Sequence, residues 1–256
     1  MWTPRRLPYL DRQTADERTA VQRLRRALKL LPDDKSQILA GRYTSSAEGS
    51  FDVENVLAYN IGMSAFRGAA LRGMSFERVR AVPPTSPSGL QFDHHHAYTP
   101  TRPPPRPRDG QTITFDLPRV CDVDNVWWAV AGSPSPTCAP ISGRFALHVE
   151  VGLTARAGLP NSLKKLLEGI VAGLQADPEP AMEGVRRLSQ RLSLPANLVA
   201  ALLTAPSSAV LGPRPRFLWA RGNSVQWNPG DDRCESVTVI GTDAQGTCVV
   251  TVNNLS

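Results

Sequence analysis

Residues 145–174 constrain the fold of this chain more than any other segment. Residues 145–151 alternate apolar and polar side chains, which is the period of a strand with one buried face. After a short turn, apolar residues recur at helical spacing from Leu163 to Leu174, and Asn161 or Ser162 is the expected N-cap. A strand followed closely by an amphipathic helix predicts that this helix covers the sheet to which the strand belongs.

The remaining pattern mixes helices with short β-rich runs. Helices are expected at 14–31, 51–71, 181–192 and 194–203, the first opened by a Thr14-x-x-Glu17 capping box. Strands are expected at 38–45, 74–82, 111–117, 126–130, 217–220, 224–227, 236–241 and 247–252. The sequence therefore predicts an α+β fold: a mixed, largely antiparallel sheet with helices packed on it.

A change in composition divides the chain. Residues 83–110 are rich in proline, which removes backbone donors and favours an extended linker or long surface loop. We expect an N-terminal helical or α+β region at 1–82, this linker at 83–110, and a C-terminal α+β domain at 111–256.

Composition favours a particular class of partner. The net charge is +6, carried mostly by arginine, and 41% of residues are hydrophobic, enough for a proper core. This balance favours a polyanion such as DNA or structured nucleic acid, although compositional bias alone would also give it. The alternative for a basic helical face is that it is only solvated. The candidate phosphate contacts are Arg18, Arg23, Arg25, Arg26, Lys29, Lys164 and Lys165.

Cellular location follows from what the sequence lacks. Its cysteines, Cys121, Cys138, Cys234 and Cys248, show no metal-binding or redox spacing. No secretory leader pattern and no membrane-length apolar run occur in the sequence. We expect a soluble, cytoplasmic protein with reduced thiols.

Two acidic tetrads could carry chemistry: Asp52-Val53-Glu54-Asn55 and Asp122-Val123-Asp124-Asn125. Two acids separated by one residue can share a Mg²⁺ ion, because a hard dication prefers oxygen ligands. The alternative is that Asp and Asn only cap or turn the chain before the apolar runs that follow. A third acidic cluster, the adjacent pair Asp231 and Asp232, is another candidate for metal binding.

The C-terminal half resembles the RusA-like Holliday-junction resolvases. The strand 145–151 precedes the helix SLKKLLEGIVAGL, in which Lys165 matches the family's lysine and Glu168 replaces its helical Asp. Asp231 and Asp232 match its D-D pair before a strand. The resemblance implies an α+β nuclease scaffold with Asp231, Asp232 and Lys165 as catalytic residues and Mg²⁺ as cofactor.

One departure bears on activity. Leu159 and Asn161 stand where the family keeps two metal-binding aspartates, and leucine cannot bind Mg²⁺. Either the scaffold persists with reduced or lost catalysis, which we favour, or Asp52 and Glu54, or Asp122 and Asp124, complete the site. The second option requires a carboxylate of Asp231 or Asp232 within about 5 Å of a tetrad.

Other polar and aromatic groups give weaker signals. The run His94-His95-His96 beside Asp93 could hold a transition metal, or be a solvated stretch. His148 should lie on the polar face of its strand, at a surface or interface. Trp127, Trp128, Trp219 and Trp227 could stack on unpaired bases, or simply fill a core.

The sequence leaves three functions open. We favour a nucleic-acid-associated protein of RusA-like fold, a Mg²⁺-dependent endonuclease or its inactive descendant. The alternatives are a non-catalytic interaction or regulatory module in a larger assembly, and an enzyme on a small substrate built around Asp52, Glu54, Tyr59 and Asn60. The oligomeric state stays open, with a dimer among the options.

Overall fold

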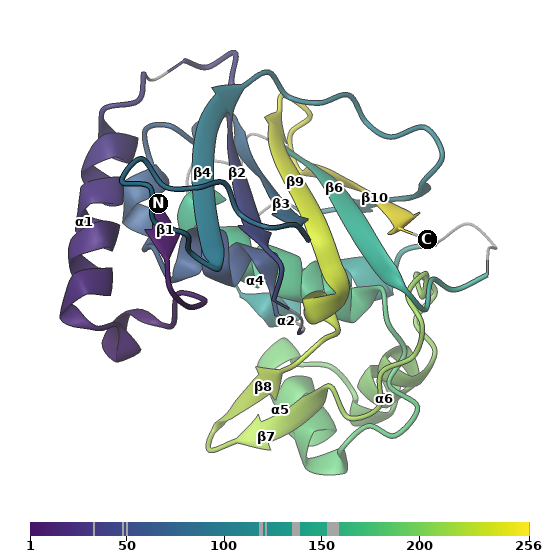
Figure 1. Ribbon diagram of the computed structural model, residues 1–256. Coiled ribbons are helices and arrows are strands. Elements are labelled where there is room, and N and C mark those ends of the chain that lie inside the picture. The colour runs from purple at the N-terminus through teal and green to yellow at the C-terminus, as the bar shows by residue number, and fades with distance from the viewer. Residues whose placement is uncertain are drawn as a thin grey trace.

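A single mixed sheet of eight strands runs through the computed structural model, which describes residues 1–32, 34–47, 49, 51–117, 120, 122–134, 139–152 and 159–255 (Figure 1). The spatial order is β1-β4-β2-β3-β9-β6-β10-β5; β2–β3 and β6–β9 pair in parallel and the other neighbours antiparallel. The strands are β1 Trp2–Thr3, β2 Ile38–Ser45, β3 Gly73–Val79, β4 His94–Thr101, β5 Gln111–Asp116, β6 Arg144–Gly152, β9 Cys234–Thr242 and β10 Thr247–Leu255. The protein is α+β, as the sequence predicts.

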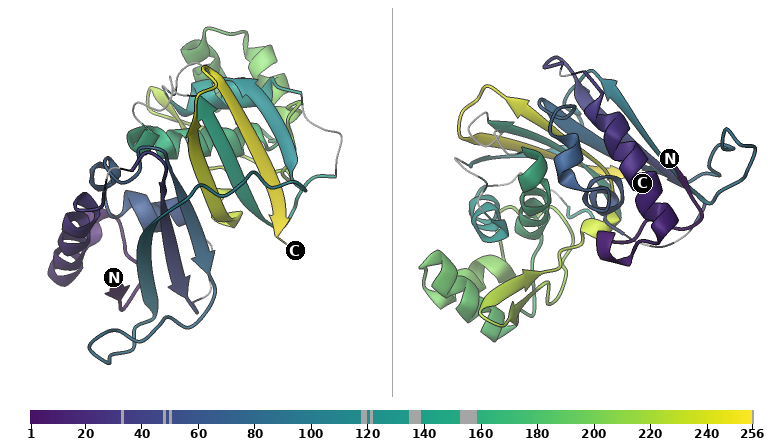
Figure 2. Two further views of the ribbon diagram at one scale, coloured as in Figure 1. Left: turned by 90° about the horizontal axis from the view of Figure 1, so that it is seen from above. Right: turned by 90° about the vertical axis from the view of Figure 1, so that its left-hand side faces the viewer.

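Helices cover one face of this sheet. These are α1 Ala15–Lys29, α2 Val123–Ala131 and α4 Leu159–Gly173, whereas α5 Met182–Leu192 and α6 Ala196–Thr204 belong to a smaller lobe. The short helical segments are η1 Leu10–Arg12, the π-helix η2 Asn55–Tyr59, η3 Met63–Phe66 and η4 Asp231–Arg233. Figure 2 shows α2 and α4 on the same side of the sheet. Leu163, Leu166 and Ile170 of α4 are buried in the main core with the inward-facing residues of β6 and β9. The expected strand at 145–151 and the helix that covers it are both confirmed.

A smaller lobe formed by α5, α6 and the hairpin β7 Leu218–Arg221 with β8 Ser224–Trp227 packs beyond α2 (Figure 1). Its own core contains Trp127, Phe217 and Trp227. Because Trp127 is fully buried and Trp227 nearly so, these two indoles fill a core and offer no open stacking surface.

Two local predictions were wrong. The apolar run at 126–130 lies in helix α2, whose N-cap Asp122 accepts a hydrogen bond from the Asn125 backbone N–H at 3.0 Å. This helix packs against both hydrophobic cores, so its apolar residues are not confined to one stripe. Their uninterrupted run in the sequence therefore looks like that of a buried strand. The expected helix at 51–71 is interrupted at Gly62, whose φ of 104° is outside the helical region.

The proline-rich region is partly a strand. Residues 94–101 form β4, which pairs with β2 and β1, so the sheet takes strands from all three regions expected from the sequence. Pro104, Pro105 and Pro107 then line a hollow on the polar face of the sheet together with His148. His148 lies on the expected face of β6, but it is only 4% exposed there.

Among the helices of the described part of the chain, none is long and apolar enough to cross a membrane. Cys234 and Cys248 are buried and form no disulfide with each other. Cys121 and Cys138 lie outside the described residues.

Candidate metal centre

Three acidic side chains that are far apart in the sequence converge beside α4. Carboxylate oxygens of Asp52, Glu54 and Asp231 all lie within 4.8 Å of one another. This spacing meets the distance that a shared site between a tetrad and the Asp231-Asp232 pair requires. Oxygens on opposite sides of a Mg²⁺ ion are about 4 Å apart, so small side-chain adjustments would let one divalent cation contact all three. The cluster could therefore bind a metal ion.

The chain before η2 holds two of these acids in place. Val53 is fully buried in the main core and fixes the backbone between Asp52 and Glu54. The side-chain amide of Asn55 donates to Asp52 Oδ2, and the Asn55 backbone N–H donates to the Asp52 carbonyl at 3.1 Å. The Asp-Val-Glu-Asn tetrad thus forms a turn, as the capping interpretation expects, and still directs both acids to the cluster.

Asp231 enters from the other end of the chain. It is the first residue of η4, directly before β9, and only 8% of it is exposed. The preceding Gly230 donates its backbone N–H to Gln175 Oε1 at 3.0 Å. A side chain at Gly230 would place a Cβ 2.7 Å from Gln175 Nε2, so the Gln175 side chain would have to shift.

Helix α4 adds a lysine and a fourth carboxylate. Lys164 Nζ lies 3.7 Å from Asp52 Oδ2, 3.6 Å from Glu54 Oε1 and 3.0 Å from Glu168 Oε1. Lys164 and Glu168 are one helical turn apart and so share a face of the helix. One ammonium group therefore sits among the carboxylates of Asp52, Glu54, Glu168 and Asp231.

The excess of negative charge shifts the protonation of the cluster. Burial, with repulsion from Asp52, raises the pKa of Glu54 to about 7. Burial, with repulsion from Asp52 and Glu54, raises the pKa of Asp231 to about 9. Burial alone would lower the pKa of Lys164, but attraction to Glu54, Glu168, Asp52 and Asp231 outweighs it and raises that pKa. The cluster thus retains protons at neutral pH unless a cation replaces them.

Glu54 carries an unsatisfied acceptor. Its Oε1 atom is buried and has no hydrogen-bond donor, because Lys164 Nζ at 3.6 Å is an ion-pair partner beyond hydrogen-bonding distance. An unsatisfied buried carboxylate oxygen costs free energy, which a bound cation would recover.

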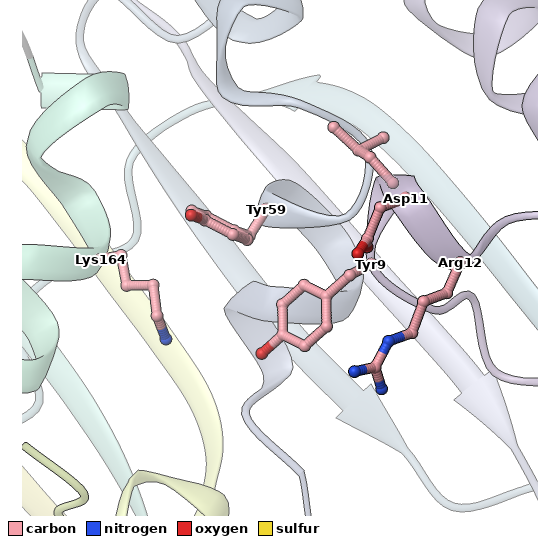
Figure 3. Close-up of a pocket in the computed structure, with 6 residues that line it drawn as sticks. Tyr9, Asp11, Arg12, Tyr59 and Lys164 are labelled. Carbon is pink, nitrogen blue, oxygen red and sulfur yellow. The ribbon is translucent and has the colours of Figure 1, made fainter.

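The cluster lies beside open space. A hollow of about 490 Å³ is lined by Tyr9, Leu10, Asp11, Arg12, Tyr59 and Lys164. In Figure 3 the Lys164 ammonium projects from α4 toward the two tyrosines, and Arg12 lies beside Tyr9. A neighbouring hollow of about 290 Å³ is lined by Asp52 and again by Tyr9 and Arg12. A solvent-borne ligand can therefore reach Lys164 and Asp52 at the edge of the cluster.

Asp232 and Lys165 lie outside this cluster. Asp232 pairs with Arg214, at 3.4 Å between Nη1 and Oδ1, so it has a cationic partner of its own. Lys165 is exposed, and its neighbour Lys164 is the lysine that enters the cluster. Sequence reasoning named Lys164 only as a phosphate contact; its i,i+4 spacing to Glu168 is the signal for its place here.

Leu159 and Asn161 occupy the two positions at which RusA-like resolvases have metal-binding aspartates. Leu159 begins α4 and is buried in the main core, so it has no access to a metal. Gly158 and the side chain of Asn161 lie outside the described residues.

The second tetrad has a structural role. Asp122 caps α2. Asp124 accepts a hydrogen bond from Trp227 Nε1 at 2.8 Å and pairs with Arg191. Both acids have their own partners, and neither belongs to the cluster formed by Asp52, Glu54 and Asp231.

The histidine run lies in strand β4, where alternation separates its side chains. Tyr43 Oη lies 2.6 Å from His94 Nδ1, and the His95 ring packs on Trp2 with centroids 4.6 Å apart. Burial lowers the pKa of His96 to about 3, which keeps it neutral. His94 and His96 both pack against Tyr43 on one face of the strand and His95 lies on the other face, so the three side chains cannot converge on one ion.

The basic face of α1 is partly structural. Arg25 Nε donates to the Ile61 carbonyl at 2.5 Å, and Arg18 donates to the Gln13 carbonyl. Arg23, Arg26 and Lys29 are exposed, which leaves them accessible to a phosphate backbone.

No protein-family model matches this chain, and no solved structure matches it significantly.

Proposed function

We propose that this protein is a Mg²⁺-dependent phosphodiesterase that cleaves nucleic acid, with the ion held by Asp52, Glu54 and Asp231. The observation that carries the proposal is the unsatisfied Glu54 Oε1 atom, which is buried among carboxylates and lies 3.6 Å from Lys164 Nζ, a side chain that lines a solvent-accessible hollow. Structural ion pairs normally satisfy their buried acceptors, whereas a metal site leaves ligand atoms free.

Bound Mg²⁺ would polarise a phosphodiester and lower the pKa of a bound water. Lys164 touches Asp52 and Glu54 through ion pairs only, so it can turn toward a phosphate oxygen once a cation satisfies those acids. Glu168, 3.0 Å away, would keep the lysine charged and oriented. Arg12, which lines both hollows, would contact a neighbouring phosphate of the nucleic-acid backbone.

The resemblance to RusA-like resolvases supports the same assignment. The departure from that family is that Leu159 and Asn161 replace its two metal-binding aspartates, which by itself favours reduced or lost catalysis. The proximity of Asp52 and Glu54 to Asp231 supports the other option, in which acids from the N-terminal half complete the site. The Lys164–Glu168 pair occupies the helix where the family places its lysine and acid.

The decisive assay is cleavage of labelled branched and linear DNA and RNA with Mg²⁺, Mn²⁺ or chelator. Asp231→Asn and Glu54→Gln should reduce cleavage at least about a hundredfold, since even outer partners of metal ligands contribute about 10–100-fold. The matched control is Asp232→Asn, which alters the adjacent residue that pairs with Arg214. Lys164→Met should likewise reduce cleavage.

Metal binding gives a readout that does not depend on turnover. Titration calorimetry with Mn²⁺ should show one site that Asp231→Asn abolishes and Asp232→Asn preserves. Absence of that site, or equal effects of the paired variants, would refute the proposal. Salt-sensitive binding of uncut DNA without a metal site would instead favour the non-catalytic module.

A further inference from the structure

Two tyrosines are exposed at the entrance to the carboxylate cluster. Tyr9 precedes η1 and is 46% exposed, and Tyr59 ends η2 and is 45% exposed. Their ring centroids are 6.1 Å apart with the planes at 88°. Every other aromatic side chain in the described residues is buried or partly buried. Apolar rings left in water beside one another indicate a surface that a ligand covers.

The tyrosine pair adjoins the reactive groups directly. Lys164 Nζ lies 5.9 Å from the centre of the Tyr59 ring and 3.7 Å from Asp52 Oδ2, so one cation touches both the aromatic surface and the carboxylates. Figure 3 shows Tyr9 and Tyr59 on one side of the hollow and Lys164 facing them. A flat ring stacked on a tyrosine would have its attached groups within reach of the cluster.

The remaining residues that line the hollow suit the parts of a nucleotide, with an apolar surface for a base and cations for a phosphate. Leu10 extends the apolar surface, and Arg12 supplies a guanidinium beside it. Arg6 continues the cationic lining into the second hollow, which also contains Asp52. The carboxylate of Asp11 lines the first hollow too, and it would direct a phosphate toward the Arg12 side. A hollow of about 490 Å³ is in the range of small-ligand sites.

We infer that the substrate is a nucleic-acid strand with an unpaired base. This base packs against Tyr9 and Tyr59 next to the phosphate that is cleaved, stacked on the face of one ring with the other ring, perpendicular to it, alongside. The inference rests on the proposed function for the cleavage step, but not for the stacking. A base can offer its face to a tyrosine only when it has left the duplex stack. Stacking accepts every base, so the protein selects unpaired strand structure over sequence.

Fluorescence of 2-aminopurine tests the stacking without turnover. The Asp231→Asn protein, which the proposed function makes inactive, is titrated in chelator with DNA and RNA strands that carry the probe at an unpaired or a paired position. We expect quenching and tighter binding for the unpaired probe, because stacking quenches this base. The DNA and RNA arms show which backbone the site takes.

Tyrosine variants decide whether the quenching arises at this site. Tyr9→Leu and Tyr59→Leu should each weaken binding of the unpaired strand about 5- to 100-fold, the usual contribution of one stacked base. Tyr59→Phe should keep both the quenching and the affinity, because the ring persists. The control is Leu30→Ala, a change at an exposed residue of α1's C-terminal end.

The two proposals fail separately. Equal binding of paired and unpaired probes, or quenching that survives in the Tyr9→Leu, Tyr59→Leu double variant, overturns the stacking inference even if the protein cleaves duplex DNA. Quenching that depends on both rings supports it even if no divalent ion brings about cleavage.

Discussion

The carboxylate cluster should make the metal-free protein less stable as the pH rises above neutral. Asp231 has a pKa of about 9 in the folded protein, because burial and neighbouring carboxylates disfavour its charge. In the unfolded chain this carboxyl group ionises near pH 4. From about pH 6.5 to about pH 8.5 the folded protein therefore binds one more proton than the unfolded chain at this residue.

The magnitude follows from that proton. Stability falls by about 1.4 kcal/mol per pH unit for each proton that the folded state retains, so Asp231 contributes a loss of about 3 kcal/mol over two units. The sign is that of a raised pKa: the contribution is fully present below the unfolded pKa and is lost as pH rises toward the folded pKa. Glu54, with a pKa of about 7, adds to the loss at the lower end of the range.

The assay is urea unfolding of wild type and Asp231→Asn at several pH values in chelator. Neutral asparagine removes the titration, so the stability difference between the two proteins should change by about 3 kcal/mol across this range. The buried histidines and the amino terminus also titrate nearby, but their contributions are common to both proteins and cancel. Mn²⁺ at about 100 times its dissociation constant should restore about 2.7 kcal/mol to wild type alone. Parallel stability–pH curves for the two proteins would refute the electrostatic account.

Three further outcomes test the packing that supports the site. Gly169→Ala should destabilise the protein by about 1–3 kcal/mol in chemical denaturation, because a Cβ there would lie 2.5 Å from Val126 Cβ; the control Gly68→Ala meets no atom within 4 Å. Trp227→Phe should cost about 1–3 kcal/mol by leaving Asp124 without the 2.8 Å indole donor, and Trp219→Phe, at a partly buried position, should cost less. Thr14→Ala should lower the free energy of unfolding by about 1 kcal/mol through loss of the α1 capping box; an equal effect of Thr19→Ala, inside the helix, would contradict the capping role.

Local patterns determined the best-predicted elements. The capping box at Thr14 and Glu17, the alternation in β6 and the apolar stripe of α4 each depend on neighbours a few residues away, so they can be read without the fold. Helix α2 packs against two hydrophobic cores, so its apolar residues do not follow the helical period. The sequence therefore predicted a strand there. Proline-rich composition likewise concealed β4, because Pro100 lies within this strand and further prolines come before and after it.

The candidate site divides in the same way. The sequence identified Asp52, Glu54 and Asp231 as acids in suggestive local settings, along with Asp122, Asp124 and Asp232, which have similar settings. Only the tertiary structure separated the two sets. Pairing of β9 with β3 and β6 places η4 near the turn before η2, whereas Arg191, Trp227 and Arg214 bind the other acids elsewhere.

The choice between two adjacent lysines was tertiary as well. Neighbouring helix residues point about 100° apart, so Lys164 and Lys165 differ only in which flank of α4 they occupy. Their local sequence cannot say which flank faces the carboxylates, because that depends on how the helix lies on the sheet. The sequence by itself determined the strand, the helix and the chemical groups available; packing over long range decided which of those groups meet.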